Sequence, residues 1–462
     1  MRMKWARSRF SAAWLVTPLL VMSAWSPAGA DATEGPPEGS DVSLTVWAFG
    51  NEVEHWRADG PAQAAADVTT WEVTVDPVLD SSNEWDSYKR KFTLAADAGE
   101  APDIIVSGHE DVPVWASAGY IVSFEECRGS HPEYDDVIDG LWDSATWDGQ
   151  VWGVPQDTEA RPLYFNKTKL AELGWSDEDI ESLPQRIQDG EFTLADMVAT
   201  ALEAQAAGVV EPGFGYWHRP LKGGDFLQYY VAHGGRIYDE EEDKLVVTRQ
   251  ALVDWYTFQR RVVEEGITPS NFIGTEWEVW HDTVSSGDVL FFNGGIWQWA
   301  DWAANYVADV GGQEYLFENF GYALQPNASA GEPGVTLSHP LVYMIVSPGA
   351  SGAENQDVAC ELLAKTSTPE INTPHAVEST HLGVLESQAD YADYAKDQLL
   401  SETLYMLDFN FYQPNHIAYG PYFDALYGSM ERAENGDASP EDAADEAIEL
   451  IEAEIGDQVI IE

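Results

Sequence analysis

Two groups of polar and aromatic residues follow segments that the sequence predicts to be β-strands. The first group, after residues 43–49, is Asn51, Glu52 and Trp56, and the second, after residues 103–106, is His109, Glu110 and Asp111. In an open α/β sheet, ligands bind beyond the carboxyl ends of the strands. Carboxylates accept strong hydrogen bonds from hydroxyl groups, and aromatic rings offer flat apolar faces. Both groups are candidates for holding a small polar molecule, while helix N-capping is the alternative role for residues 109–111.

A third group lies in a link between strand-like segments, where Asp157, Glu159 and Arg161 alternate along the chain. In an extended chain, alternate side chains point to the same side. The three side chains are therefore expected on one side of the link. They could contact a ligand there, or they could form an ion pair within the link.

The elements that would position these groups alternate between strand and helix. Strands are predicted at residues 43–49, 70–75 and 103–106, with a helix at 85–96 whose buried side is Tyr88, Phe92, Leu94 and Ala95. Gly99 is expected to cap that helix at its C-terminus. Helices follow at 194–206, 250–265 and 357–364, and strands at 289–292, 321–324 and 342–346. Ser439 and Pro440 mark the start of a C-terminal helix. The order predicts an α/β fold built from βαβ units.

Length, composition and charge restrict the function classes. The chain has 462 residues, 44% hydrophobic and 12% aromatic, which suits two domains and excludes general disorder. It carries 80 acidic residues against 23 basic residues, a formal charge of -57. This excludes nucleic acid as an expected partner and disfavours anionic ligands. A salt-rich environment is one hypothesis for the charge, and ordinary acidity of a secreted protein is the other.

The N-terminus resembles an export signal. Arg2, Lys4, Arg7 and Arg9 precede an apolar stretch at residues 12–21, and Ala28-Gly29-Ala30 gives a cleavage pattern. Residues 1–30 are therefore expected to be a cleaved signal peptide, and residues 31–42 a flexible leader. No cysteine lies near the cleavage site, so we expect a periplasmic or secreted protein without a lipid anchor.

Cysteine and histidine spacing offers no local metal-binding motif. Cys127 and Cys360 would face an oxidising compartment, but the sequence does not show whether they pair. His109 and His131, like His339 and His375, are too far apart in the chain for a local site. We therefore expect neither a metal nor a cofactor.

Several segments together resemble the extracellular solute-binding proteins of sugar ABC transporters, the family of the periplasmic maltose-binding proteins. The segments are Leu44-Thr45-Val46-Trp47, the helix–Gly–Pro–Asp–strand unit at residues 88–105, Ala118-Gly119-Tyr120-Ile121, Gly153-Val154-Pro155 through Lys167, Gly294-Gly295-Ile296-Trp297 and the tail at 424–455. Their order and spacing span nearly all of the chain after the signal peptide.

The resemblance implies a type II periplasmic-binding fold, with two α/β lobes joined by hinge strands and a ligand held between them. Lobe 1 would comprise residues 43–156 and 335–386, and lobe 2 residues 157–334 and 387–462. The ligand would be a mono- or oligosaccharide, the partner a membrane permease, and the protein a monomer without catalytic activity.

The resemblance also assigns ligand contacts. Asn51, Glu52, Glu110, Asp111 and Glu159 match positions that contact sugar in the family. Tyr216, Trp217 and His218 match its sugar-stacking loop, Trp297 a stacking tryptophan, and Tyr422 and Phe423 a stacking position near the tail, with Asp301 one helical turn after Trp297. Ser107 departs from the family, which carries a stacking tryptophan there, so linear maltodextrins are in doubt.

Three other functions remain open from the sequence. A cationic or zwitterionic solute is the first, because aromatic faces and carboxylates also hold cations. A secreted glycosidase with two carboxylates is the second, although the sequence contains neither a Gly-x-Ser-x-Gly nor a His-Glu-x-x-His pattern. A polysaccharide-binding surface module is the third, and its usual β-sandwich conflicts with the predicted helices.

Overall fold

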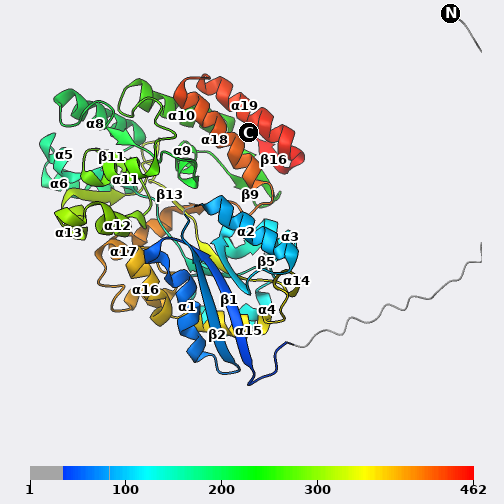
Figure 1. The fold of residues 1–462 in the computed structure, drawn as a ribbon. Helices are drawn as coiled ribbons and strands as arrows, with labels where there is room; N and C mark the ends of the chain where they lie inside the picture. The colour runs from blue at the N-terminus through cyan, green and yellow to red at the C-terminus, as the bar shows by residue number, and fades with distance from the viewer. Residues whose placement is uncertain (1–34, 83) are drawn as a thin grey trace, which may run out of the picture. The chain divides into compact units, whose positions relative to one another are not determined.

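Strand β1 (Asp41–Phe49) is the centre from which the N-terminal part of the protein is built. Its residues 42, 44, 46 and 48 are buried while their neighbours are not, as the alternation in the sequence predicts. β1 pairs in parallel with β2 (Glu72–Asp80) on one side and with β3 (Ile104–Gly108) on the other. The computed structural model describes residues 35–82 and 84–462 (Figure 1).

A late part of the chain completes this sheet. β14 (Leu341–Ile345) runs antiparallel between β3 and β6 (Val154–Asp157), which gives the five-stranded order β2-β1-β3-β14-β6. The helices that pack with this sheet are α1 (Trp56–Ala64), α2 (Trp85–Ala98), α3 (Val112–Ser117), α4 (Glu125–Ser130), α14 (Pro348–Ser351) and α15 (Gln356–Thr366). A short hairpin, β4 (Thr146–Trp147) and β5 (Gln150–Val151), precedes β6.

A second sheet system forms the rest of the protein. A four-stranded sheet has the order β12 (Phe320–Ala323), β7 (Leu163–Asn166), β11 (Phe291–Asn293) and β8 (Tyr216–Trp217), and a three-stranded sheet the order β16 (Val459–Ile461), β10 (Lys244–Val247) and β9 (Tyr238–Asp239). The helices are α5 (Lys167–Glu172), α6 (Asp177–Glu181), α7 (Leu183–Gln188), α8 (Leu194–Ala207), α9 (Leu227–Ala232), α10 (Arg249–Glu264), α11 (Trp277–Ser286), α12 (Gln298–Asp301), α13 (Gln313–Asn319), α17 (Gln398–Thr403), α18 (Tyr419–Asn435) and α19 (Pro440–Ile455).

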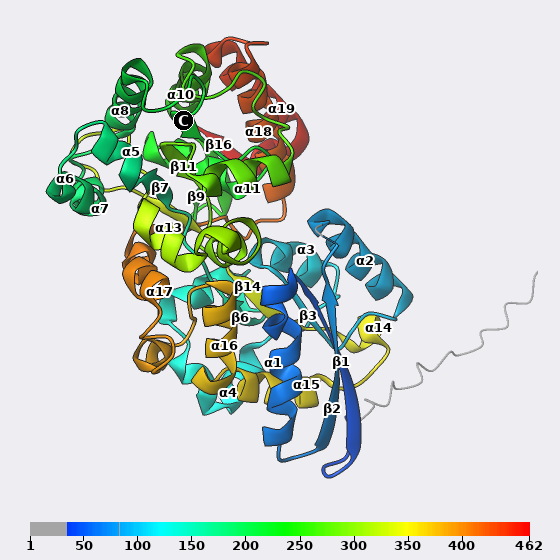
Figure 2. The same ribbon diagram turned by 60° about the vertical axis from the view of Figure 1, so that its left-hand side comes forward.

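The buried side chains form two separate hydrophobic cores, and we name the two lobes after them. Lobe 1 surrounds the core of the five-stranded sheet, and lobe 2 surrounds the core of the four-stranded sheet (Figure 2). The chain crosses between the cores repeatedly, for example from Val154 to Ala160 and from Leu324 to Leu341. Helix α16 (Pro369–Ser379) places Ile371 in the core of lobe 1 and Ala376 in that of lobe 2.

A small sheet lies at these crossings. β13 (Thr336–Ser338) pairs in parallel with β15 (Asn410–Tyr412), so two crossing segments that are far apart in sequence run side by side. The predicted α/β fold of two lobes is confirmed. The lobe boundaries expected from the sequence stay a prediction.

Most predicted elements are present, and one predicted burial pattern is wrong. Helix α2 ends at Gly99, whose φ of 71° is the left-handed cap that the sequence indicates. Tyr88, Phe92 and Ala96 are its buried residues, whereas Leu94 is 64% exposed. Leu94 lies two residues after Phe92, about 200° around a helix with 3.6 residues per turn, so it points away from the sheet.

The predicted signal peptide at residues 1–30 lies outside the described residues, together with the start of the leader. Within residues 35–82 and 84–462, no helix is both long and apolar enough to cross a membrane.

A disulfide joins two helices of lobe 1. Cys127 in α4 and Cys360 in α15 are bonded, with their Cα atoms 5.6 Å apart and their positions in the sequence 233 residues apart. Tyr134 packs beside the bond and donates a hydrogen bond to the carbonyl oxygen of Cys360 at 3.0 Å. The bond thus ties the N-terminal half of lobe 1 to the segment that returns late in the chain.

We expect replacement of both cysteines by alanine to lower the free energy of unfolding by about 2–5 kcal/mol, because the bond closes a very long loop in the unfolded chain. Urea unfolding followed by tryptophan fluorescence measures the change. Adding a reductant should destabilise the natural protein by a similar amount and leave the double variant unchanged. Equal stability of the two proteins under oxidising conditions would contradict this role.

Candidate functional site

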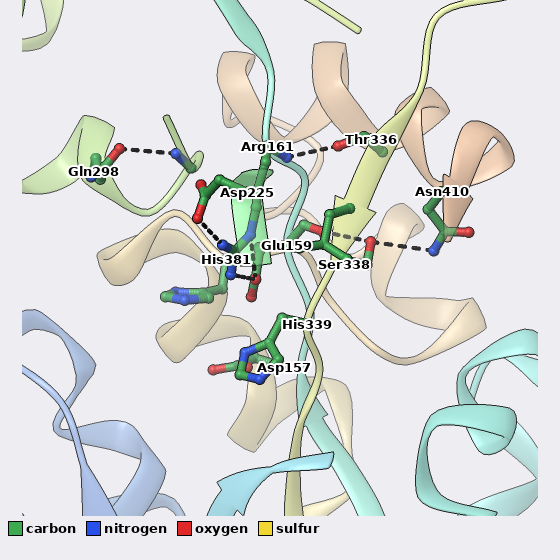
Figure 3. A network of polar contacts seen from close by, with 12 residues as sticks. Asp157, Glu159, Arg161, Asp225, Gln298, Thr336, Ser338, His339, His381 and Asn410 are labelled. Atoms are coloured by element: carbon green, nitrogen blue, oxygen red, sulfur yellow. Dashed lines mark hydrogen bonds and ion pairs between the residues drawn. The ribbon is translucent and has the colours of Figure 1, made fainter. Parts of the chain in front are cut away.

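Arg161 forms the centre of a buried ion-pair network at the first crossing between the lobes. Its Nη2 donates to Glu159 Oε1 at 2.7 Å, and its Nη1 donates to Asp225 Oδ2 at 2.6 Å (Figure 3). Asp225 belongs to lobe 2 and also accepts from Arg219 at 3.3 Å. Burial raises the pKa of Glu159. Burial also opposes ionisation of Asp225, but Arg161 and Arg219 hold its pKa below the usual value. The ion-pair alternative for this link is therefore realised.

Hydrogen bonds between crossing segments hold Arg161 in place. The Arg161 backbone N–H donates to Thr336 Oγ1 at 2.8 Å, and Ser338 Oγ donates to the Glu159 carbonyl at 2.7 Å. Asn410 Nδ2 donates in turn to Ser338 Oγ at 3.2 Å. Figure 3 shows these contacts side by side, so three segments that link the lobes share one hydrogen-bonded frame.

Asp157 anchors a second part of the network with groups from lobe 1 and from α16. Arg57 in α1 donates from Nε to Asp157 Oδ2 at 2.9 Å and from Nη2 to His381 Nε2 at 3.0 Å. His375 in α16 contacts the same Oδ2 at 2.7 Å, and Glu54 pairs with Arg57 at 2.7 Å. Burial alone would raise the pKa of Asp157, but Arg57 and His381 hold it far below its usual value.

A third part of the network follows strand β3. Glu110 Oε2 accepts from His339 Nε2 at 2.6 Å, and Glu110 Oε1 accepts from Lys89 Nζ at 2.5 Å. Lys89 also contacts Asp111 Oδ2 at 2.9 Å. Burial raises the pKa of Asp111 to about 6, although Lys89 opposes the shift. His109 is fully buried behind this group, and burial followed by repulsion from His339 lowers its pKa to about 4.

Trp297 brings an aromatic face from lobe 2 to this network. Its ring lies 4.9 Å from the Arg161 guanidinium carbon and is stacked 6.0 Å from the His381 ring. A Cβ on Gly295 would lie 1.7 Å from the Trp297 ring, and one on Gly294 would lie 2.4 Å from Gln298 Oε1. The two glycines therefore make room for the side chains of their own loop, a need that the sequence did not reveal.

We call these side chains together the interlobe cluster. They are Glu54, Arg57, Lys89, His109, Glu110, Asp111, Asp157, Glu159, Arg161, Arg219, Asp225, Trp297, His339, His375 and His381. The cluster contains six sequence-predicted site residues, namely His109, Glu110, Asp111, Asp157, Glu159 and Trp297.

The other predicted residues of lobe 1 lie at the edge of this cluster. Asn51 Oδ1 accepts from the Val53 N–H at 3.0 Å and caps the short helix Glu52–Glu54. Glu52 is exposed, and Trp56 donates from Nε1 to Glu378 Oε2 at 2.9 Å. Asn51 therefore positions the turn that carries Glu54, and its contact with a ligand stays a prediction.

The remaining predicted residues of lobe 2 lie mostly in its core. Tyr216 and Tyr422 are fully buried, with their hydroxyl groups bonded to Tyr229 and to the Val246 carbonyl. Trp217 donates to the Gly213 carbonyl at 2.7 Å, and His218 contacts Glu434 at 3.0 Å. Phe423 stacks on Tyr419 and lies beside Lys222, and Asp301 accepts from Asn305 at 2.7 Å. Their core placement does not support the predicted ligand contacts of residues 216–218 and Tyr422.

Sequence reasoning missed several members of the cluster. The missed residues are Glu54, Arg57, Lys89, Arg219, Asp225, His375 and His381. One available signal was the scarcity of basic residues, since only 23 lysines and arginines occur among 80 acids. Four of those basic side chains lie in this one cluster. In so acidic a chain, the positions of the few basic residues therefore indicate where carboxylates are paired in a cluster.

A cavity of about 850 Å³ opens between the lobes next to the cluster. Residues of the β4–β5 hairpin, including Trp147, line it from lobe 1, and Tyr238 lines it from lobe 2. Asn415 lines it from a crossing segment and accepts from His109 Nδ1 at 2.8 Å, so Asn415 lies between the cavity and His109 of the cluster. None of the sequence-predicted site residues lines this cavity.

Solved structures share the fold. The GacH receptor of Streptomyces glaucescens GLA.O, solved unliganded and with acarbose, superposes with a TM-score of 0.71 at 19% identity, covering 91% of this chain and 99% of that one. The cyclic alpha-maltosyl-1,6-maltose binding protein from Arthrobacter globiformis gives 0.70 at 20% identity, covering 90% and 100%. The two-lobe architecture is thus the type II periplasmic-binding fold.

Sequence comparison identifies the family. The diacetylchitobiose binding protein DasA of Streptomyces coelicolor is 25% identical over 220 residues, which are 47% of this chain and 45% of that protein. The match thus spans less than half the length of this relative. The model of the bacterial extracellular solute-binding protein family matches residues 58–371, which include parts of both lobes and most of the interlobe cluster. The chain therefore belongs to the bacterial extracellular solute-binding protein family.

Proposed function

We propose that this protein is the substrate-binding component of an ABC importer and that it captures a mono- or oligosaccharide between its lobes. The observation that carries the proposal is the interlobe cluster, to which both lobes and the crossing segments contribute polar side chains. Trp297 adds an aromatic face at the same place. The names of the relatives, which include binders of diacetylchitobiose and of a cyclic maltosyl-maltose, support a sugar as the ligand.

The chemistry of the cluster suits a neutral, hydroxyl-rich ligand. Carboxylates accept hydrogen bonds from hydroxyl groups, guanidinium groups donate them, and the Trp297 ring can cover a flat C–H face. Several buried polar atoms lack a hydrogen-bond partner among the described residues, including Asp157 Oδ1 and Tyr419 Oη. Such atoms cost free energy unless something pairs with them, and sugar hydroxyls would do so.

A cationic or zwitterionic solute fits the cluster less well. Six carboxylates are present, but Arg57, Lys89, Arg161 and Arg219 already neutralise most of their charge. A cationic ligand would have to displace these side chains from ion pairs at 2.5–3.3 Å. A neutral ligand can bind beside them without breaking any pair.

Export and delivery complete the proposal. Residues 1–30 would direct the chain out of the cytoplasm, and the processed protein would act as a monomer in the periplasm or outside the cell. A membrane permease would then recognise the surfaces of both lobes while the ligand is held between them, and receive the ligand when the lobes separate.

We expect one or more sugars to raise the melting temperature of the purified protein without being hydrolysed. Binding to the folded state alone stabilises it by about 2.7 kcal/mol at a ligand concentration one hundred times Kd. A thermal-shift panel of mono- and oligosaccharides, with quaternary amines as the comparison set, identifies the ligand class.

Incubation with the same saccharides and an assay of reducing ends tests for catalysis. No release is expected, because Glu159 and Asp225 are both held by Arg161 rather than placed on opposite sides of an open space. Hydrolysis of a saccharide would favour the glycosidase alternative over the binding proposal. Stabilisation by quaternary amines alone would identify a cationic solute, and not a sugar, as the ligand.

Substitution of Trp297 by alanine should weaken binding of that sugar at least tenfold, since an aromatic ring contributes a large, rigid apolar contact area. Isothermal titration calorimetry measures the effect. Trp147→Ala is the matched control, because Trp147 is also half-buried between the lobes but lines the neighbouring cavity. Unchanged affinity in Trp297→Ala together with a loss of affinity in Trp147→Ala would indicate that the sugar binds in the cavity and not in the cluster.

A further inference from the structure

Two groups in the interlobe cluster bring together residue types that bind metal ions. They are Asp157 with His375 and His381, and His109 with Glu110 and His339. Within each group, one ligand atom of each residue lies within 4.8 Å of those of the other two. The residues of a group come from distant parts of the sequence, so local spacing could not reveal them.

The first group is already bonded to a positively charged side chain of the protein, Arg57. Arg57 donates to Asp157 Oδ2 at 2.9 Å and to His381 Nε2 at 3.0 Å. The lone pair of His381 and the carboxylate charge are therefore both in use. A metal ion there would have to displace the Arg57 guanidinium from both of these acceptor atoms.

The second group differs because one imidazole nitrogen is available. Asn415 donates from Nδ2 to the carbonyl oxygens of Ser144 and Thr146 at 2.6 and 3.0 Å, which fixes its Oδ1 as an acceptor. His109 Nδ1 lies 2.8 Å from that Oδ1 and must therefore carry the proton. His109 Nε2 then presents a lone pair, is buried, and has no hydrogen-bond partner among the described residues.

This arrangement has the features of a metal-binding histidine. Histidines that ligate metals usually donate their other ring N–H to a carbonyl or carboxylate oxygen, which fixes the tautomer and the ring orientation. Asn415 plays that part for His109. His339 Nε2 and Glu110 Oε2, 2.6 Å apart, supply one more nitrogen and a carboxylate oxygen. Two histidines and a glutamate form a ligand set that binds Zn²⁺ with one position open.

We propose that His109, Glu110 and His339 bind a divalent transition-metal ion, with Zn²⁺ as the best fit. The ion would take the place of the proton that His339 shares with Glu110, and that proton would pass to the solvent. Ligands of tetrahedral zinc lie about 3.3 Å apart for bonds of about 2.0–2.1 Å, so modest side-chain rotations are sufficient. Lys89 contacts the opposite oxygen of Glu110, Oε1, and leaves Oε2 free to face the ion.

Calorimetric titration of the EDTA-treated protein with Zn²⁺ in excess Mg²⁺ tests the site without any sugar, so the result is independent of the proposed function. The Mg²⁺ occupies exposed carboxylates, which are abundant in this chain. One Zn²⁺ per chain is expected, with a proton released. Co²⁺ substitution should add the visible absorption of a four-coordinate site.

His109→Gln and His339→Gln should each weaken Zn²⁺ binding at least tenfold. His131→Gln, which alters a histidine outside both groups, should not change it. Asn415→Ala should weaken binding about 10- to 100-fold through the orientation of His109, and circular dichroism confirms that each variant is folded. The proposal is overturned if the natural protein binds no Zn²⁺ under these conditions, or if either histidine variant binds it as tightly.

Discussion

The pairing of buried charges where the chain crosses between its lobes is the constraint on which the rest of the structure depends. Arg161 joins Glu159 of its own link to Asp225 of lobe 2, and Arg57 joins α1 to Asp157 at the end of β6, where the chain leaves lobe 1. Loss of one partner from a buried pair leaves the other charge uncompensated and costs about 3–5 kcal/mol. The crossing segments, α16 and the start of α1 must therefore keep their relative positions. The same requirement brings polar groups of both lobes to a single place, as ligand capture needs.

Local patterns in the sequence were sufficient to predict the elements that surround this place. The alternation in β1, the glycine cap of α2 and the serine and proline at the start of α19 are each local signals, and the structure contains all three. Leu94 shows the limit, because an apolar residue in an amphipathic helix is not always on its buried side.

The partners within the interlobe cluster could not be predicted in the same way. His339 and Glu110 are 229 residues apart, and His381 and Arg57 are 324 residues apart. Only the topology of the crossings brings them together. The aromatic residues at 216–217 and Tyr422 matched sugar-stacking positions by sequence, but they fill the core of lobe 2. A shift of one residue or of one helical turn changes whether a ring faces the core or the ligand. Sequence spacing alone does not resolve such a shift.

The acidic residues of the chain occupy two kinds of place in the structure, the interlobe cluster and the exposed surface. A few carboxylates belong to the interlobe cluster, where basic residues balance most of their charge. Many others are exposed, as on the outer face of α19, where Glu441, Asp442 and Glu449 face solvent. An excess of exposed acids favours solubility and repels anionic ligands at a distance. The salt-rich habitat inferred from the charge stays a prediction.

The most direct test of ligand capture between the lobes is hydrogen–deuterium exchange with and without the sugar that stabilises the protein. The interlobe site predicts slower exchange in peptides from both lobes and from the crossing, namely residues 107–111, 157–161 and 295–302. Protection confined to one lobe, or found only around residues 143–149 and 235–243, would contradict the interlobe cluster as the place where ligand binds.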